Sequence, residues 1–356
     1  MGKHIKFIKT CLLLTGAGLI LVTVGILAGG TVYGLSISGD GIQVQAPLLD
    51  KNKKEETVCK QEEEKLEAFD AVMIDGEYEN VRIEASGSDE YSLSYCLNKD
   101  NPLSREIKDG RLILRHENNK VLGIKNFTWF SVGNSRADRA EEYVTVRVPK
   151  EAKLKSAEIK TDSGDAACEN IQADTIKIEA DYGRADFLNV SSETMEIKLD
   201  SGDLKMENVQ AGQCTVQSEY GDAAFYHAAF TGGMNIAMDS GDIRCSDTSF
   251  GTLSVTSAYG NLDIQESEAG NVQMSLENGE CKLQQVQTDG CKINAEYGSV
   301  HLALKQPVTD YAYRLITEYG TVKIGGRDMG RSYASLDEEN QKQIEITCES
   351  GDILIE

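Results

Sequence analysis

The chain has 356 residues, of which 58 are acidic and 36 are basic, and its formal net charge is −22. Such a strong negative charge argues against nucleic acid as a partner and against charge-driven adhesion to anionic lipid. The four histidines are scattered and no Cys-x-x-Cys sequence occurs, which argues against a zinc site. The sequence also lacks a Gly-x-Ser-x-Gly motif, a phosphate loop and a dinucleotide fingerprint, so it shows none of these catalytic or cofactor signatures.

The N-terminal segment predicts a membrane anchor. Residues 1–9 contain three lysines and form the expected cytoplasmic tail, and the stretch that follows is uncharged as far as Gly39. Because roughly 20 apolar residues span a bilayer, we expect a transmembrane helix over residues 10–35. Basic residues before this helix and acidic residues after it place the bulk of a single-pass protein outside the cell. A cleaved signal peptide is the alternative, although the apolar run is long and no Ala-x-Ala site follows.

Two further regions precede the repeats. Residues 36–67 are predicted to be a charged linker, because residues 48–67 are dense in charge. Residues 68–155 contain several short runs typical of strands, without a fixed period. We expect them to form an irregular β region that caps the open end of the repeats, as stacked repeats require.

A short phrase recurs through residues 156–356: usually an acidic residue, then Ser or Tyr, then Gly. The eight glycines of its regular part are 19 or 20 residues apart, and two later ones follow at intervals of 22 and 31. A fixed period of about this length is typical of solenoids. The predicted turn glycines are Gly164, Gly183, Gly202, Gly221, Gly241, Gly260, Gly279 and Gly298.

The apolar residues within each repeat alternate at period two. They fall two and four positions after the glycine and again 12, 14 and 16 positions after it. This pattern predicts short strands with one buried face, and recurrence in the same register predicts that successive strands pair in parallel. The sequence therefore predicts an all-β fold, a parallel β-solenoid of coils of about 19 residues, with the glycines at tight turns.

The residue before the glycine alternates between Ser or Asn and Tyr, as in Ser201 and Tyr220. The residue two positions earlier alternates in the opposite sense, as in Leu199 and Ser218. We interpret this as compensation of side-chain volume between neighbouring coils: where one of the two positions carries a large residue, the other carries a small one. Cores disfavour both voids and overpacking. The tyrosines are then core residues, and Tyr220→Ala should cost about 3 kcal/mol.

Nine cysteines suggest disulfides at first, but six of them fall at apolar strand positions of the repeats. These six are predicted to be free, buried residues, because free cysteine behaves as a small hydrophobe. They are Cys168, Cys214, Cys245, Cys281, Cys291 and Cys348. Cys59 and Cys96 lie outside the repeats and remain candidates for a disulfide.

An acidic residue precedes the turn glycine by two positions in almost every coil. The candidate row consists of Asp162, Asp181, Asp200, Glu219 and Asp239. One interpretation is a solvated edge that resists aggregation. The other is a row of weak divalent-cation sites, with Ca²⁺ as the candidate ion, since Ca²⁺ prefers oxygen ligands. No other cofactor is predicted.

The Asp-Ser-Gly phrase also occurs in aspartic proteases, but its regular recurrence indicates a turn motif rather than the paired carboxylates such an enzyme needs.

Three segments carry a resemblance to a known family: residues 144–165, 195–209 and 344–356, which read VTVRVPKEAKLKSAEIKTDSGD, MEIKLDSGDLKMENV and IEITCESGDILIE. They resemble a bacterial β-strand-repeat domain of unknown function that is labelled putative adhesin and includes LiaG-like envelope proteins. The resemblance covers roughly residues 68–356. It implies a binding surface, a link to envelope stress systems, and an envelope or membrane protein as partner. It implies no catalytic residues.

These observations together favour a non-enzymatic function. We expect a membrane-anchored, extracytoplasmic β-solenoid that acts as an adhesin-like binding module or as an envelope-stress component. The alternative is a polysaccharide-active enzyme on a β-helix scaffold, which would need clustered carboxylates or aromatic sugar platforms on one face.

Overall fold

The computed structural model describes residues 33–38, 41–47, 57–98, 102–116, 142–335 and 342–356. The chain divides into two units, residues 1–56 with 118–140, and residues 57–117 with 141–356. In the first unit, the antiparallel hairpin of β1 (Tyr33–Ser38) and β2 (Gly41–Pro47) is described. Strand β1 contains residues 33–35, so the helix predicted over residues 10–35 does not extend that far. Its remaining residues lie outside the described part, in which no helix is long and apolar enough to cross a membrane.

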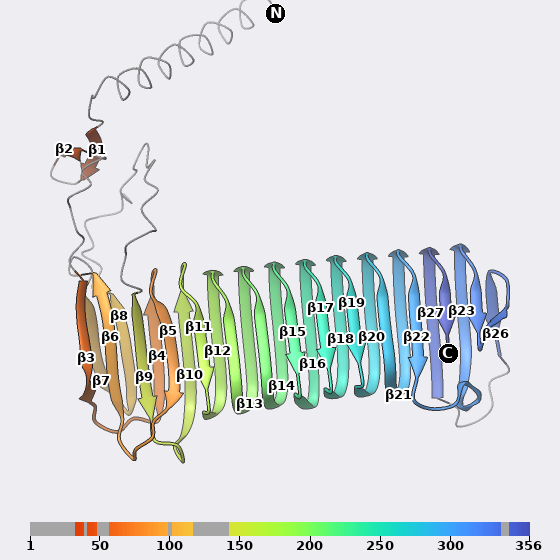
Figure 1. The fold of residues 1–356 in the computed structure, drawn as a ribbon, viewed down its shortest axis with the longest axis horizontal. Helices are drawn as coiled ribbons and strands as arrows, with labels where there is room; N and C mark the ends of the chain where they lie inside the picture. The colour runs from red at the N-terminus through yellow and green to blue at the C-terminus, as the bar shows by residue number, and fades with distance from the viewer. Residues whose placement is uncertain (1–32, 39–40, 48–56, 99–101, 117–141, 336–341) are drawn as a thin grey trace, which may run out of the picture. The chain divides into compact units, whose positions relative to one another are not determined.

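The second unit is a stack of coils joined by parallel pairing, which confirms the predicted all-β architecture with parallel strands (Figure 1). Two ladders of strands run along the stack. The first ladder contains, in spatial order, β8 (Arg111–His116), β4 (Ala71–Gly76), β10 (Lys153–Thr161), β12 (Gln172–Tyr182), β13 (Ala185–Ser201), β14 (Leu204–Tyr220), β16 (Ala229–Ser240), β18 (Ser249–Tyr259), β20 (Glu268–Asn278), β21 (Cys281–Tyr297), β27 (Lys342–Ser350) and β23 (Tyr311–Tyr319).

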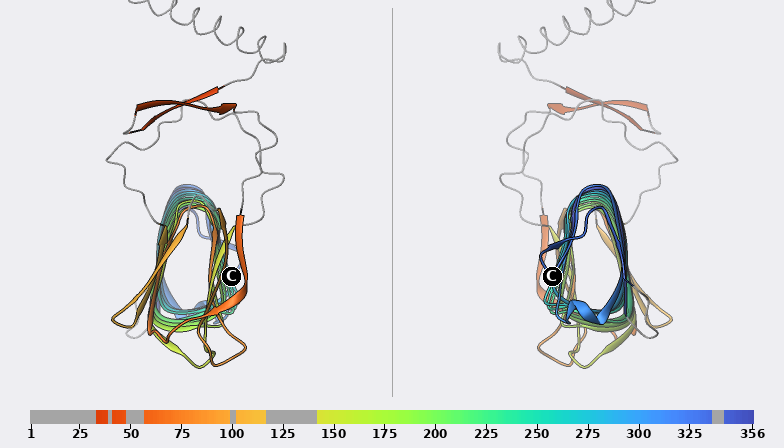
Figure 2. Two further views of the ribbon diagram at one scale, coloured as in Figure 1. Left: turned by 90° about the vertical axis from the view of Figure 1, so that its left-hand side faces the viewer. Right: turned by 90° about the vertical axis from the view of Figure 1, so that its right-hand side faces the viewer.

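The second ladder shares the long strands β13, β14 and β21, which continue through a corner of the coil. Its other members are β9 (Tyr143–Val148), β5 (Asn80–Ala85), β11 (Ala166–Glu169), β15 (Ala223–Tyr226), β17 (Ile243–Ser246), β19 (Leu262–Gln265), β22 (Val300–Leu304), β28 (Ile353–Ile355) and β24 (Val322–Ile324). Viewed along the stack, the coils superimpose as flattened ovals (Figure 2).

The pairing register reproduces the sequence period. Ile178 lies opposite Ile197, which in turn lies opposite Val216, so equivalent residues are 19 positions apart. In the 20-residue coil the extra residue is absorbed by an irregularity between Phe230 and Met234. Equivalent positions of successive coils therefore face the same side of the sheet along the stack.

The interior of the stack is one continuous apolar cluster. Phe187, Phe225 and Phe230 are among its largest fully buried side chains. The six repeat cysteines are free and buried, as predicted. Burial raises the pKa of the Cys168 and Cys214 thiols to about 12, which keeps them protonated and inert at neutral pH.

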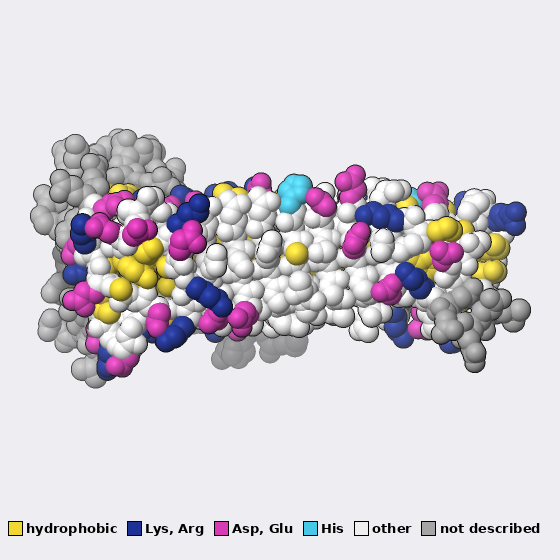
Figure 3. All heavy atoms as spheres, turned by 90° about the horizontal axis from the view of Figure 1, so that it is seen from below, with side chains coloured by type: hydrophobic (Ala, Val, Ile, Leu, Met, Phe, Trp, Pro, Cys, Tyr) yellow, Lys and Arg dark blue, Asp and Glu magenta, His cyan; other side chains and the backbone are white. Residues whose placement is uncertain are grey.

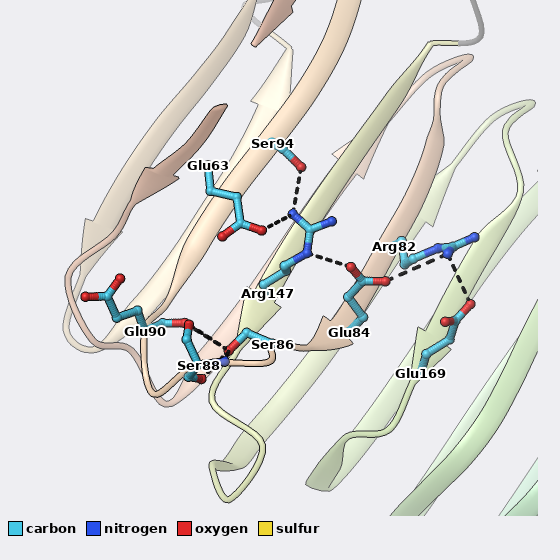
Figure 4. Close-up of polar contacts among 9 residues, drawn as sticks. All are labelled: Glu63, Arg82, Glu84, Ser86, Ser88, Glu90, Ser94, Arg147 and Glu169. Carbon is cyan, nitrogen blue, oxygen red and sulfur yellow. Dashed lines mark hydrogen bonds and ion pairs between the residues drawn. The ribbon is translucent and has the colours of Figure 1, made fainter. Parts of the chain in front are cut away.

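Antiparallel strands close the N-terminal end of the stack. There β7 (Leu103–Lys108) pairs with β8, and β6 (Ser92–Asn98) pairs with β9 and with β3 (Thr57–Lys65). Figure 4 shows the ion pairs on this end, where Arg147 contacts Glu84 at 2.7 Å and Glu63 at 2.9 Å. Strands β3 and β6 place Cys59 opposite Cys96, and Cys96 is disulfide-bonded.

The C-terminal end departs from sequence order. Strands β27 and β28, the last in the chain, insert between β21–β22 and β23–β24 and pair in parallel with both. The coil with Gly351 therefore lies between the coils of Gly298 and Gly320, which explains the late intervals of 22 and 31 residues. The outer coil is edged by β25 (Arg327–Asp328) and β26 (Ser332–Ala334), which are antiparallel, and is preceded by the 3₁₀ helix η1 (Val308–Asp310).

Candidate ligand-binding edge

One corner of each coil from Gly164 onwards is formed by the recurring phrase, and we call this corner the glycine edge. Each glycine backbone lies directly against the glycine of the neighbouring coil. A Cβ atom on Gly202 would lie 1.8 Å from the carbonyl oxygen of Gly183, and the φ angle of Gly202 is 150°. Only glycine fits both the close approach and this dihedral angle. In spatial order the edge contains Gly164, Gly183, Gly202, Gly221, Gly241, Gly260, Gly279, Gly298, Gly351 and Gly320.

The residue after the glycine ties neighbouring coils together. The Oδ1 atom of Asp222 accepts a hydrogen bond from the backbone amide of Asp242 at 2.9 Å, and Asp242 does the same for Asn261. Basic side chains near this edge also pair with these carboxylates: Arg244 contacts both Asp222 and Asp242. Carboxylates at this position therefore have a structural role, since each satisfies a backbone donor of the next coil.

The residue two positions before the glycine behaves differently. We call these residues the acidic row: Asp162, Asp181, Asp200, Glu219, Asp239, Glu277, Glu296, Glu349 and Glu318. Among the described residues their side chains form no hydrogen bond or ion pair, and almost all are exposed. Within the same residues, no three His, Cys, Asp or Glu side chains are grouped closely enough to hold a metal ion. Calcium binding by the first five members stays a prediction, tested by thermal unfolding in calcium and in sodium at equal ionic strength.

The structure corrects our interpretation of the tyrosines. Tyr182, Tyr220, Tyr259 and Tyr297 are 63, 59, 58 and 52 % exposed, so they are surface residues and not core residues. The strands run on to these tyrosines, but neither of the last two residues of each strand is buried, so the alternation of buried and exposed side chains is interrupted there. The large and small residues that alternate, such as Leu199 and Ser218, are buried, but the tyrosines take no part in that packing.

The alternation of tyrosine and small polar residues holds in space along the whole stack. The register places Tyr78 beside Ser163 and places Ser350 between Tyr297 and Tyr319. Six exposed tyrosines thus occupy every second coil, separated by Ser or Asn, and we call them the tyrosine row: Tyr78, Tyr182, Tyr220, Tyr259, Tyr297 and Tyr319. Two strand spacings separate successive members by about 9.6 Å.

The N-terminal end of this row was not predicted from the sequence. Tyr78 escaped notice because Glu79 stands where later coils have glycine. The Oε2 atom of Glu79 accepts a hydrogen bond from the amide of Tyr78 at 3.1 Å, and its Oε1 atom lies 2.7 Å from Nε2 of the buried His116. Burial raises the pKa of Glu79, but the hydrogen bond and charge of His116 and the backbone amides of Glu77 and Glu79 outweigh it, so the pKa is lowered. This buried pair fixes the turn that presents Tyr78.

A second sharp corner follows the glycine by six residues, and the sequence analysis did not recognise it. Its residues have φ angles of 51° to 55° although none is glycine: Asn170, Asn189, Asn208, His227, Asp247, Glu266 and Gln285. We call it the left-handed corner. Neighbouring asparagine side chains bond across coils, with Asn189 donating to Asn170 at 2.8 Å. The run of Asn at one position was the available signal, because Asn tolerates this conformation best.

Other surfaces of the stack are less organised for binding. From below, the middle of the stack presents mainly uncharged polar groups and backbone, and charged side chains gather towards both ends (Figure 3). A shallow depression of about 410 Å³ on the strand face is lined by polar residues such as Ser254, Gln273 and Asn294. Of the surfaces described, the glycine edge alone combines exposed aromatic rings with unpaired charge.

Comparison with known proteins agrees with the resemblance noted from the repeats. The family model Toastrack DUF4097 matches residues 69–248 and 225–312. The chain belongs to this family. None of the curated proteins compared with the chain is similar to it.

Solved structures also match the chain, at low identity and with TM-scores below 0.5. A putative adhesin from Parabacteroides distasonis is 12 % identical, with a TM-score of 0.46, over 84 % of this chain and 97 % of that one. A putative adhesin from Bacteroides fragilis is 12 % identical, with a TM-score of 0.39, over 85 % and 98 %. A putative lipid-binding protein from Parabacteroides distasonis is 13 % identical, with a TM-score of 0.39, over 85 % and 97 %. Matches at this level say nothing about what the chain binds.

Proposed function

We propose that the chain is a membrane-anchored, extracytoplasmic β-solenoid that binds a ligand at the cell envelope without transforming it. The tyrosine row carries this proposal. Its six rings stay exposed at one position of alternate coils, and the pattern persists where the C-terminal strands are inserted out of sequence order. An ordered row of exposed aromatic rings along one edge favours an interaction site, because tyrosine is enriched where proteins bind their partners. An extended, periodic surface suits a polymeric ligand or a protein partner of the envelope.

The anchoring part of the proposal rests on the N-terminal sequence. The three lysines of residues 1–9 and the uncharged stretch up to Gly39 favour a single-pass helix with its N-terminus in the cytoplasm. The disulfide at Cys96 supports an extracytoplasmic location, because disulfides persist in oxidising compartments. A protease added to intact cells should then digest the repeats and leave the N-terminal tail intact. Release of a soluble protein into the medium would contradict the anchor.

Binding is tested with the full chain in nanodiscs of neutral lipid. Cell-wall polysaccharide, anionic vesicles, and cationic and anionic peptides are titrated separately, with empty nanodiscs as the control. We expect saturable binding of at least one ligand class with no chemical change in it. If no class binds, the proposal is wrong. If new reducing ends appear in the polysaccharide, the chain is a polysaccharide-active enzyme instead.

A further inference from the structure

We propose that the tyrosine row, together with the acidic row, binds an extended polypeptide segment bearing lysine or arginine side chains. This inference rests on the proposed binding function and names the chemistry of its ligand. It predicts that each bound cation lies over a tyrosine ring, and that at four of the six rings an acidic-row carboxylate directly precedes the tyrosine. Exposed rings attract ammonium and guanidinium groups through the cation–π interaction.

Charge complementarity selects a cationic occupant. The acidic row places a carboxylate two positions before the glycine in each coil from Asp162 to the C-terminal end of the stack except the one with Ala258. Successive coils are about 4.8 Å apart, so these charges lie close together along the edge. Nearby basic side chains do not neutralise them: Arg184 pairs with Asp165 and Asp186, at the other side of the glycine. An anionic polymer or anionic lipid would be repelled by the same row.

The arrangement of the two rows has an energetic consequence. Like charges directly opposite each other in neighbouring strands destabilise a sheet. A bound polycation would remove this repulsion while its side chains cover the rings of tyrosines such as Tyr220 and Tyr259. Four tyrosines directly follow an exposed carboxylate of the acidic row, so one cationic side chain can contact both groups: Tyr182, Tyr220, Tyr297 and Tyr319.

The spacing of the tyrosines favours a particular ligand conformation. Successive rings are about 9.6 Å apart, two strand spacings. A polyproline II segment rises about 3.1 Å per residue, so every third residue recurs at about 9.3 Å. An extended β-strand repeats its side-chain direction at about 6.8 Å and does not match. A segment with a basic residue at every third position therefore presents one cation to each ring.

The test uses the full chain in nanodiscs of neutral lipid and a fluorescent peptide of six Lys-Pro-Pro repeats, one for each tyrosine of the row. Binding is measured by fluorescence anisotropy at low salt. We expect saturable binding of this peptide, and none of the matched peptide with Glu in place of Lys. Binding should weaken as salt rises, because the carboxylates contribute through charge.

The deciding variant replaces Tyr182, Tyr220, Tyr259 and Tyr297 by Ser, the residue that alternate coils already carry. Affinity for the lysine peptide should fall about 30-fold, because four exposed cation–π contacts are lost together. Replacement of the same four residues by Phe keeps the rings and should retain the affinity. Equal melting temperatures of the Ser and Phe variants show that the fold is intact.

Three outcomes overturn the inference. In the first, the Ser variant binds the lysine peptide as tightly as the original chain does, and binding would then be only a general attraction between polyelectrolytes. In the second, the lysine and glutamate peptides bind equally. In the third, the row binds a neutral polysaccharide in a tyrosine-dependent manner and the lysine peptide does not bind. In this last case the proposed binding function survives, whereas a chain that binds no ligand at all in either experiment fails both.

Discussion

The two sharp corners of each coil constrain the sequence in different ways. At the glycine edge, a Cβ atom on Gly221 would lie 2.1 Å from the carbonyl oxygen of Gly202 in the neighbouring coil. At the left-handed corner, Asn208, His227 and Glu266 adopt φ angles of 51° to 55° with their side chains exposed. The first corner is restricted by the close approach of another coil and the second only by its own dihedral angles. A close approach leaves no alternative to glycine, whereas a strained dihedral angle can be tolerated at a modest cost.

The largest expected effect is the loss of a glycine from the glycine edge. Gly221→Ala should destabilise the fold by about 3–5 kcal/mol, because the new Cβ clashes with the adjacent coil and the φ angle of 126° is strained. The midpoint of denaturant unfolding measures it. Gly325→Ala is the matched control, because Gly325 also has a positive φ angle, 53°, but no atom lies near its Cβ position. The control should cost about 1 kcal/mol. Similar midpoints for both variants would contradict the conclusion that the close approach, and not the dihedral angle, requires glycine at this edge.

This contrast also explains what could be predicted from the sequence. The period, the parallel pairing and the glycines were predictable, because the neighbouring coil imposes the same residue at the same place each time. The outward orientation of Tyr220 was not predictable, because Glu219 and Tyr220 are both exposed at the end of β14 and the residue types do not reveal this break in the alternation. The position of β27 was not predictable either. Its strand pattern fits any place in the first ladder, and only tertiary packing inserts it between β21 and β23.

The next largest effect separates the two acidic positions that flank the glycine. Asp222→Ala should cost about 1–2 kcal/mol, since it leaves the amide of Asp242 without the acceptor that lies 2.9 Å away. Asp239→Ala, in the acidic row, removes a carboxylate that has no partner among the described residues, and should change stability by less than about 0.5 kcal/mol. Thermal unfolding of both variants measures the difference. A larger loss for Asp239→Ala would contradict the assigned roles.

The stabilisation that Asp222 provides should depend on pH, because the pKa of its carboxyl group is shifted. The hydrogen bond from the backbone amide of Asp242 lowers this pKa, burial opposes it, and Arg244 lowers it further. A lowered pKa means that the stabilisation is present above the unfolded value, about 4, and is lost as the pH falls through the folded value. The difference between the original chain and Asp222→Ala should therefore shrink below about pH 4. Solvent screening limits the size of this stability difference, because the Asp222 side chain is 48 % exposed.

At the left-handed corner, glycine should be an improvement where the native side chain makes no bond across coils. Glu266→Gly should stabilise the fold by about 0.5–1 kcal/mol, because relief of a left-handed conformation outweighs the extra entropy of the unfolded chain. Asn189→Gly is the comparison, since it also removes the bonds to Asn170 and Asn208 and should gain nothing. Melting temperatures decide the sign. If Glu266→Gly destabilises the fold, the left-handed conformation costs the native residue less than the entropy that glycine adds to the unfolded chain, and the corner has no preference for glycine.

The smallest expected effect concerns the residue next to the most restricted one. Tyr220 precedes Gly221, yet its ring is 59 % exposed, so Tyr220→Ser should change the unfolding free energy by less than about 0.5 kcal/mol. Phe225→Ala, in the same coil, removes a fully buried ring and should cost about 3–5 kcal/mol. If Tyr220→Ser approached the cost of Phe225→Ala, the tyrosines would be packing residues and the proposed docking surface would fail. If it is neutral, the glycine edge combines a backbone that cannot vary with a neighbouring side chain that folding does not require, and the tyrosine row is then available for binding.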